Sequence, residues 1–186
     1  MINTQSSTRK WDFHRYGVGL SRFVESDIEM VRQWRNSPKI SQQMLDKTYI
    51  SETQQQAWYQ RLREDESQQY FLAFFKDQAI GVVSLIKIDR LSGTAEPGMY
   101  IYNDDFINNI VPFCVAFALN DFAFEALQLT RLLGKIYLSN SASIRFHKAS
   151  GYQVDNIDEK RCLQLMHLDK STYDLAKQKI TKFIRY

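Results

Sequence analysis

The stretch YLSNSASIRFHKASGY, Tyr137–Tyr152, is the most informative segment of this chain. The apolar alternation of residues 131–138 predicts a strand that leads into it. Asn140 is a residue type that caps helix N-termini, and Gly151 is one that ends helices, so a helix is expected at residues 141–149. Capping accounts for both residues, so the segment by itself leaves the function open.

Two helices are expected near the N-terminus, after a short strand at residues 17–24. Ser26 and Glu29 have the spacing of a capping box, in which each side chain bonds the other residue's backbone amide. Ser51 and Gln54 repeat this spacing, which predicts the start of the second helix.

The middle of the chain has the periodicity of strands. Residues 70–76, 79–89 and 94–102 are rich in aromatic and β-branched side chains and are separated by short turns, which predicts three antiparallel strands. A long apolar helix follows at residues 111–127, with Pro112 in its first turn, where a missing amide costs least.

After the opening stretch, the sequence predicts strands near residues 152–154 and 161–169, and then a basic helix that begins with Ser171. The complete order of elements predicts an α+β, or mixed α/β, fold in which a long helix connects two core strands. No repeat or linker divides the chain. Residues 11–186 are therefore expected to form a single domain after a polar tail at residues 1–10.

The composition is that of a globular protein and narrows the function. The 186 residues include 24 basic and 21 acidic side chains, a net charge of +3, which argues against a dedicated nucleic-acid-binding protein. The longest apolar run, residues 110–119, is too short to cross a membrane, so no membrane partner is expected. Cys114 and Cys162 are too few for a disulfide framework or a four-ligand zinc site. A cytoplasmic protein without a metal is expected.

The opening stretch also resembles a known family. Asn140, Ser143 and the following IRFHKASGY resemble the N-x-x-S segment and helix of the GCN5-related N-acetyltransferases (GNATs). AEPGMYI at residues 95–101 is similar to the family's central strand, and FAFEAL at residues 122–127 is similar to the end of its long helix. The resemblance implies one domain with a mostly antiparallel, split sheet that is flanked by helices and followed by a C-terminal helix.

The first third of the chain resembles the branch of this family that acetylates UDP-linked deoxyamino sugars, as in the pseudaminic-acid pathway. Residues 31–36, 50–51 and 80–83, with Met44 and Trp58, carry this similarity. The ribosomal-protein and polyamine (diamine) acetyltransferases share much of the layout. The resemblance implies direct transfer of acetyl from acetyl-CoA to a primary amine of a small molecule. An amino-sugar nucleotide is the favoured acceptor, and the ribosomal-protein and polyamine types are the alternatives.

The resemblance further implies where the substrates bind. In the family, acetyl-CoA lies between two splayed strands and bonds the backbone of the central strand. The residues expected to bind the cofactor are Met99, Tyr100, Ile101, Tyr102, Ile107, Asn108, Asn109, Ile110, Val111, Asn140 and Ser143. Trp34, Arg35 and Met44 are expected to contact the acceptor. Packing in the core is the alternative for Trp34, and a helix salt bridge, with Lys39 nearby, is the alternative for Arg35.

Two residues are expected to transfer protons. Glu96 lies on the central strand among apolar residues, which would raise its pKa and suit it to accept a proton from the amine. His147 falls where many family members have the tyrosine that protonates the departing thiolate, and a histidine can supply that proton. The alternatives are an exposed strand glutamate and a surface histidine.

The phosphate-binding loop departs from the family pattern. The family's (R/Q)-G-x-G-x-(G/A) loop falls on residues 107–112, which contain no glycine, and Pro112 lacks an amide. The chain has seven glycines, where average usage would give about 13. Gln54 and Gln55 also stand where the sugar-nucleotide branch tends to have a histidine. These departures leave open a GNAT-like domain that binds without catalysing, and the oligomeric state, including a homodimer, is also open.

Overall fold

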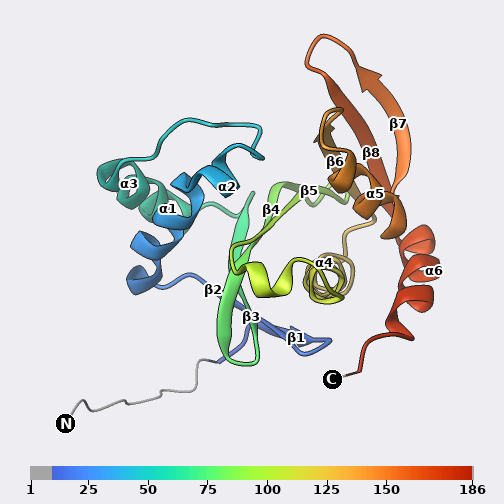
Figure 1. Ribbon diagram of the computed structural model, residues 1–186, viewed down its shortest axis with the longest axis horizontal. Coiled ribbons are helices and arrows are strands. Elements are labelled where there is room, and N and C mark those ends of the chain that lie inside the picture. Colours follow the sequence, from blue (N-terminus) through green and yellow to red (C-terminus); the bar gives the residue numbers. More distant parts are fainter. Residues whose placement is uncertain (1–9, 186) are drawn as a thin grey trace.

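The computed structural model describes residues 10–185, so the predicted polar tail lies outside the described residues except for Lys10. In this part of the chain, one eight-stranded sheet has the order β1-β2-β3-β4-β5-β6-β8-β7 (Figure 1). The strands are β1 (Phe13–Arg15), β2 (Val18–Arg22), β3 (Gln69–Phe75), β4 (Gln78–Asp89), β5 (Thr94–Ile101), β6 (Arg131–Tyr137), β7 (Gln153–Asp158) and β8 (Leu163–Asp169).

The sheet is antiparallel except at one pair, as predicted. β5 and β6 run parallel, and their register covers only Thr94 with Arg131 and Ala95 with Leu132. The predicted hairpin between β3 and β4 is confirmed: Lys76 and Asp77 have φ values of 49° and 60°, as a two-residue type I′ turn requires.

Helices cover both faces of the sheet (Figure 1). They are α1 (Ile28–Asn36), α2 (Pro38–Ser41), α3 (Glu52–Leu62), α4 (Val111–Asp121), α5 (Ser141–Ala149) and α6 (Lys170–Thr181). Apolar side chains of α1 and α3 pack on Leu72 and Val82 on one face. The other face packs against α4, which continues through a π-helical turn at Phe122–Ala126. None of the helices in residues 10–185 is long and apolar enough to cross a membrane.

The predicted capping box of the first helix is wrong. The chain first makes a 3₁₀ turn, Glu25–Asp27, in which the amide of Val24 donates to the Asp27 carboxylate over 2.8 Å. Glu29 instead forms an ion pair with Arg32, with 2.6 Å between Oε1 and Nη2. An i,i+3 partner of opposite charge therefore holds Glu29 away from the backbone. The second capping box, Ser51 with Gln54, is confirmed.

Three further details differ from the sequence predictions. β1 and the four-residue helix α2 lack a periodic pattern long enough to identify them. The last helix begins at Lys170 rather than Ser171, and Lys170 forms an ion pair with Asp174 over 2.9 Å within it. β7 is longer than expected, and Tyr152 lies outside it, buried under the sheet.

Candidate active site

A cavity of about 1190 Å³ opens where β5 and β6 diverge. Its lining comes from β5 and β6, from the neighbouring strand β4, from the helices α1 to α5, and from the loop at residues 42–50 that connects α2 to α3. The ladder between the two strands ends at Ala95 and Leu132, so beyond this point the β6-facing edge of β5 has no strand partner. An unpaired strand edge of this kind can bond an extended ligand through its backbone.

Most of the predicted site residues surround this cavity. Met99, Tyr100, Ile101, Ile107, Asn108, Asn140, Ser143, Glu96, His147, Arg35 and Met44 all line it. The predicted cofactor residues Tyr102, Asn109, Ile110 and Val111 do not line it. Trp34 does not line it either: the side chain is 9% exposed and stacks on Tyr102 with 4.8 Å between ring centroids, so it lies in the core.

The loop before α4 offers three free amides despite its lack of glycine. The amides of Asn108, Asn109 and Ile110 have no hydrogen-bond partner among residues 10–185. The next amide, that of Val111, donates to Asn109 Oδ1 over 2.8 Å, and Pro112 has none. Free amides before a helix N-terminus can bind anions, and this loop offers three of them, while residues 111 and 112 offer none.

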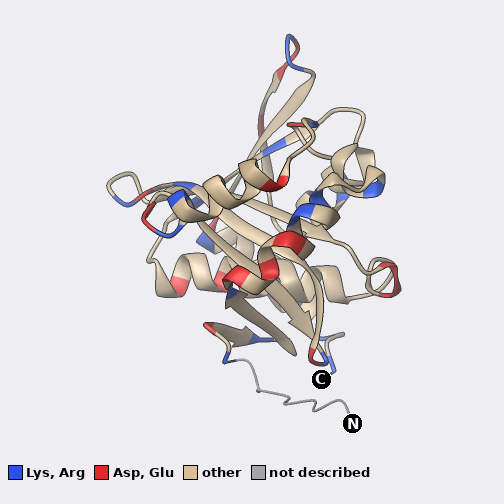
Figure 2. Cartoon of the chain, turned by 90° about the vertical axis from the view of Figure 1, so that its left-hand side faces the viewer, with Lys and Arg blue, Asp and Glu red and all other residues tan. Residues whose placement is uncertain are grey.

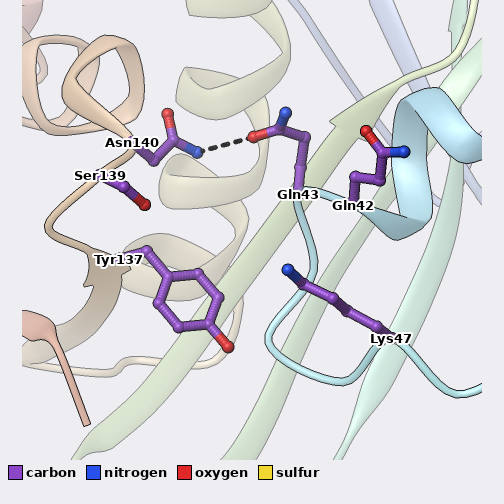
Figure 3. A pocket seen from close by; sticks show the side chains of 6 residues that line it. All are labelled: Gln42, Gln43, Lys47, Tyr137, Ser139 and Asn140. Carbon is purple, nitrogen blue, oxygen red and sulfur yellow. Dashed lines mark hydrogen bonds between the residues drawn. The ribbon is translucent and has the colours of Figure 1, made fainter.

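Asn140 links α5 to the loop at residues 42–50. Its Oδ1 accepts the amide of Ser143 over 3.0 Å, which confirms the predicted cap, and its Nδ2 donates to Gln43 Oε1 over 3.3 Å (Figure 3). The Tyr137 hydroxyl donates to the carbonyl of Leu45 over 3.2 Å. A second, polar pocket of about 570 Å³ lies here, lined by Gln42, Gln43, Lys47, Tyr137, Ser139 and Asn140. The loop thus spans from α2 to the C-terminal half of the sheet.

Glu96 lies between two ammonium groups. Its Oε1 is 2.5 Å from Lys135 Nζ on β6 and 3.0 Å from Lys87 Nζ on β4. Burial raises the pKa of Glu96, but the hydrogen bonds from Lys135 and Lys87 outweigh burial and hold the pKa below its ordinary value of 4.5. The predicted raised pKa is therefore wrong. The apolar neighbours of Glu96 in the sequence do not reveal Lys135, which comes from another strand.

His147 is half-buried on α5. Its Nδ1 lies 2.8 Å from the carbonyl oxygen of Ser143, and its ring packs edge-on against Tyr152 with 4.8 Å between centroids. Tyr152 packs beneath β6 at Gly134, where an added Cβ would lie 3.4 Å from the tyrosine ring, an ordinary van der Waals contact. Burial lowers the pKa of His147 below 6.5, against the Ser143 hydrogen bond, which raises it.

Three buried polar side-chain atoms have no hydrogen-bond partner in the described part of the chain, and all three residues line the cavity. They are Arg35 Nη1, the Tyr100 hydroxyl and the Ser150 hydroxyl. Nη2 of Arg35 donates to the carbonyl of Asp46. Lys39 pairs with Asp104 over 3.0 Å. The helix salt bridge considered for Arg35 is therefore replaced by contacts with other segments.

The sequence interpretation missed Lys87, Lys135 and the Tyr100 hydroxyl as polar groups of the site. The alternation of β6 holds a signal for one of them, because Lys135 and Arg131 are on the same face, opposite to that of the buried Leu132. For Lys87, on a β-bulge with a φ of 51°, no sequence pattern marks the direction of the side chain.

A split sheet with a ligand-sized cavity between two diverging strands and an asparagine-capped helix beside it is the architecture of an acyltransferase of the GNAT type. A family model for the acetyltransferase (GNAT) domain matches residues 18–153, and the chain belongs to this family. The predicted fold and the predicted enzyme class, an N-acetyltransferase, are confirmed.

Individual relatives agree with this assignment. The chain is 26% identical over 149 residues to acetyltransferase PseH of Campylobacter jejuni, a match that covers 76% of this chain and 88% of that protein. A structure of C. jejuni N-acetyltransferase PseH in complex with acetyl coenzyme A has a TM-score of 0.65 at 19% identity, over 82% of this chain and 99% of that one. A spermidine N-acetyltransferase from Vibrio cholerae, in complex with CoA and spermine, has a TM-score of 0.77 at 18% identity, over 86% and 99%.

Proposed function

We propose that the chain transfers the acetyl group of acetyl-CoA to a primary amine of an amino-sugar nucleotide. The charge of the cavity lining carries this proposal. Its cationic side chains are Arg35, Lys39, Arg61 and Lys135, and its carboxylates are Asp46 and Glu96. A lining with this excess of cations attracts an acceptor that carries phosphates and repels a polyamine, which is itself a polycation.

The acceptor end of the cavity supports a substrate rich in oxygen atoms. Arg35 Nη1 is a donor without a partner in residues 10–185, and so is the Tyr100 hydroxyl, which can also accept. Buried polar atoms without partners cost free energy, and a ligand that supplies oxygens at both positions recovers it. Phosphate, sugar hydroxyl and amide oxygens meet this requirement, whereas the amines of a protonated polyamine offer donors only.

Acetyl-CoA fits the other end. The β6-facing edge of β5 at residues 99–101, which has no strand partner on that side, can bond its pantetheine arm, and the free amides of residues 108–110 can bond its pyrophosphate. The relative PseH was crystallised with acetyl coenzyme A, which supports the same co-substrate.

Both cysteines are free, which supports the proposed cytoplasmic location.

The test is an acceptor panel with thiol release as the readout, together with melting curves with and without acetyl-CoA. The panel contains a UDP-linked deoxyamino sugar, spermidine and an N-terminal ribosomal-protein peptide. We expect acetyl-CoA to raise the melting temperature, and kcat/KM for the sugar nucleotide to exceed that for spermidine at least 100-fold. A preference for spermidine or the peptide would overturn the acceptor class. No melting shift and no thiol release on any amine would instead favour the non-catalytic binding domain.

A further inference from the structure

We infer that neutral His147 acts as a two-way proton relay, taking a proton from the attacking amine and passing it to the departing sulfur. This inference rests on the proposed function, because it assigns a role in the same transfer. It differs from the roles implied by the resemblance, in which Glu96 accepts one proton and His147 supplies another.

Hydrogen bonding fixes the tautomer of His147. Nδ1 lies 2.8 Å from the backbone carbonyl oxygen of Ser143, which only accepts, and 3.4 Å from the Ser143 hydroxyl, which can accept as well. Nδ1 therefore carries the ring hydrogen, and in the neutral ring Nε2 holds a lone pair. Nε2 has no hydrogen-bond partner among residues 10–185, and the side chain lines the cavity between β5 and β6.

The surroundings keep this ring neutral near pH 7. The titratable group packed against it is the phenol of Tyr152, and the charged groups that line the cavity from β5 and β6 are Glu96 and Lys135. On its own helix, Lys148 is exposed. Burial of the ring lowers the pKa of His147 below 6.5. A neutral imidazole in this tautomer has no proton at Nε2 to donate until it has accepted one.

Glu96 is a poor alternative base. Its carboxylate is an anion held by two ammonium groups at 2.5 Å and 3.0 Å, and its pKa is lowered. A carboxylate with a lowered pKa binds a proton weakly. In the same cavity, Nε2 of His147 is a basic atom that no ammonium group or other partner among residues 10–185 holds.

A single imidazole can both accept and donate the proton that moves during the acetyl transfer. The neutral amine attacks the thioester carbonyl carbon, so a C–N bond forms and the carbonyl electrons move to oxygen. The surplus N–H proton passes to Nε2 of His147. The carbonyl re-forms as the C–S bond breaks, the electron pair leaves with sulfur, and Nε2–H protonates that thiolate. Since the nitrogen and the sulfur are bonded to the same carbon, one ring nitrogen can reach both.

The first experiment tests the tautomer without any acceptor. The enzyme is labelled with ¹⁵N in its imidazole rings, and the three histidine signals are assigned with His14→Gln, His147→Phe and His167→Gln. We expect the His147 ring to be neutral at pH 7, with the hydrogen on Nδ1, and to titrate below 6.5. A hydrogen on Nε2, or a charged ring at pH 7, would overturn the relay whatever the acceptor is.

The second experiment uses the sugar-nucleotide acceptor and the dependence of kcat/KM on pH. The relay needs neutral His147, so activity rises with pH through the titration of this residue; an acid-only role predicts a fall over the same range. His147→Phe should lower kcat at least 100-fold, because acid–base catalysis contributes factors of about 10²–10⁴. It should also remove the rise of kcat/KM with pH that comes from the titration of His147. His147→Tyr should stay impaired, since it restores only an acid, and Glu96→Gln should keep kcat within about tenfold.

The controls separate this inference from the proposed function. Lys148→Gln, on the exposed side of α5, should behave as the wild type. The rise of kcat/KM with pH that comes from deprotonation of the acceptor's own ammonium group should persist in every variant. Turnover near wild type in His147→Phe, or a loss in Glu96→Gln as large as that in His147→Phe, would refute the relay. If the wild-type protein acetylates no amine, the proposed function fails, and the NMR result still decides the state of His147.

Discussion

Lys135 Nζ on β6 lies 2.5 Å from Glu96 Oε1 on β5, just beyond the point where these two strands lose their ladder. The contact ties the two sides of the split together and gives the acceptor side of the cavity a fixed charge. Lys87 approaches the same oxygen from β4 at 3.0 Å, so the cluster as a whole is cationic. A bond across the split therefore limits the divergence of the strands, and under the proposed function the net positive charge of the cluster favours an anionic acceptor.

The cluster predicts how the stability of the fold depends on pH. The pKa of Glu96 is lower in the folded chain than its ordinary value of 4.5. Its carboxylate therefore stabilises the fold fully above about pH 4.5, and this contribution is lost as the pH falls through the folded-state pKa. Glu96→Gln should lower the free energy of unfolding at pH 7 by about 1.5–3 kcal/mol, the range of charge-assisted hydrogen bonds.

Urea unfolding of both proteins between pH 3 and pH 7 measures this difference. The difference between the two proteins should narrow as the pH falls towards the folded-state pKa of Glu96, because its carboxylate begins to take up a proton. A difference that widens towards pH 3 would contradict a stabilising role of the Glu96 carboxylate. Lys87→Met, which leaves the shorter contact intact, should show a smaller loss at pH 7 than Lys135→Met.

Arg35 should affect acceptor binding and leave the cofactor site unchanged. Because Nη1 is buried without a partner in residues 10–185, it is available for an acceptor oxygen. Losing one charge-assisted bond costs about 1.5–3 kcal/mol, so Arg35→Gln should raise KM for the sugar nucleotide roughly 10- to 100-fold. The Kd for acetyl-CoA should be unchanged. Arg63→Gln, an exposed arginine at the end of α3 that does not line the cavity, is the matched control.

A change in acetyl-CoA affinity as large as the change in KM would contradict the placement of Arg35 at the acceptor end. Steady-state kinetics with the acceptor varied and calorimetry with acetyl-CoA give the two values separately.

The sequence was sufficient for the architecture but not for the charges of the site. Local periodicity and the Ser51, Asn140 and Gly151 signals predicted the helices and strands around the split, because these signals act within a few residues. The ionisation of Glu96 depends on Lys135, 39 residues away in the chain. Only the parallel pairing of β5 with β6 brings the two together, and no local pattern contains it.

Trp34 also shows that a local sequence pattern does not determine which neighbours a side chain contacts. Its position in a family-like motif favoured a role in acceptor binding, but its ring stacks on Tyr102 at an interplanar angle of 10° and is buried. A residue of an amphipathic helix can face either the core or a cavity next to the core. Which of the two it faces depends on where the next strand lies, and the sequence of the helix does not specify that.

The proline in the phosphate loop predicts a gain of affinity on substitution. Pro112 occupies the second position of α4, where a helix otherwise has a free amide directed at an anion. Pro112→Ala adds this donor, and a net gain of about 1 kcal/mol corresponds to roughly fivefold tighter acetyl-CoA binding. Calorimetric titration measures the change. Desulfo-CoA, which keeps the phosphates, should gain equally, whereas pantetheine, which has none, should not; an equal gain for pantetheine would place the effect elsewhere.

Asn140 should separate the stability of α5 from its connection to the loop at residues 42–50. Its Oδ1 caps the helix at the Ser143 amide, and its Nδ2 donates to Gln43. Asn140→Ala removes both bonds and should cost about 1 kcal/mol, or about 2–4 °C in melting temperature for a chain of this size. Asn140→Asp keeps the capping oxygen and removes only the donor, so its melting temperature should stay near that of the wild type.

If the loop contact contributes to acceptor binding, both variants should raise KM for the acceptor, although only one loses stability. Equal melting temperatures for Asn140→Ala and the wild type would show that the cap does not stabilise α5.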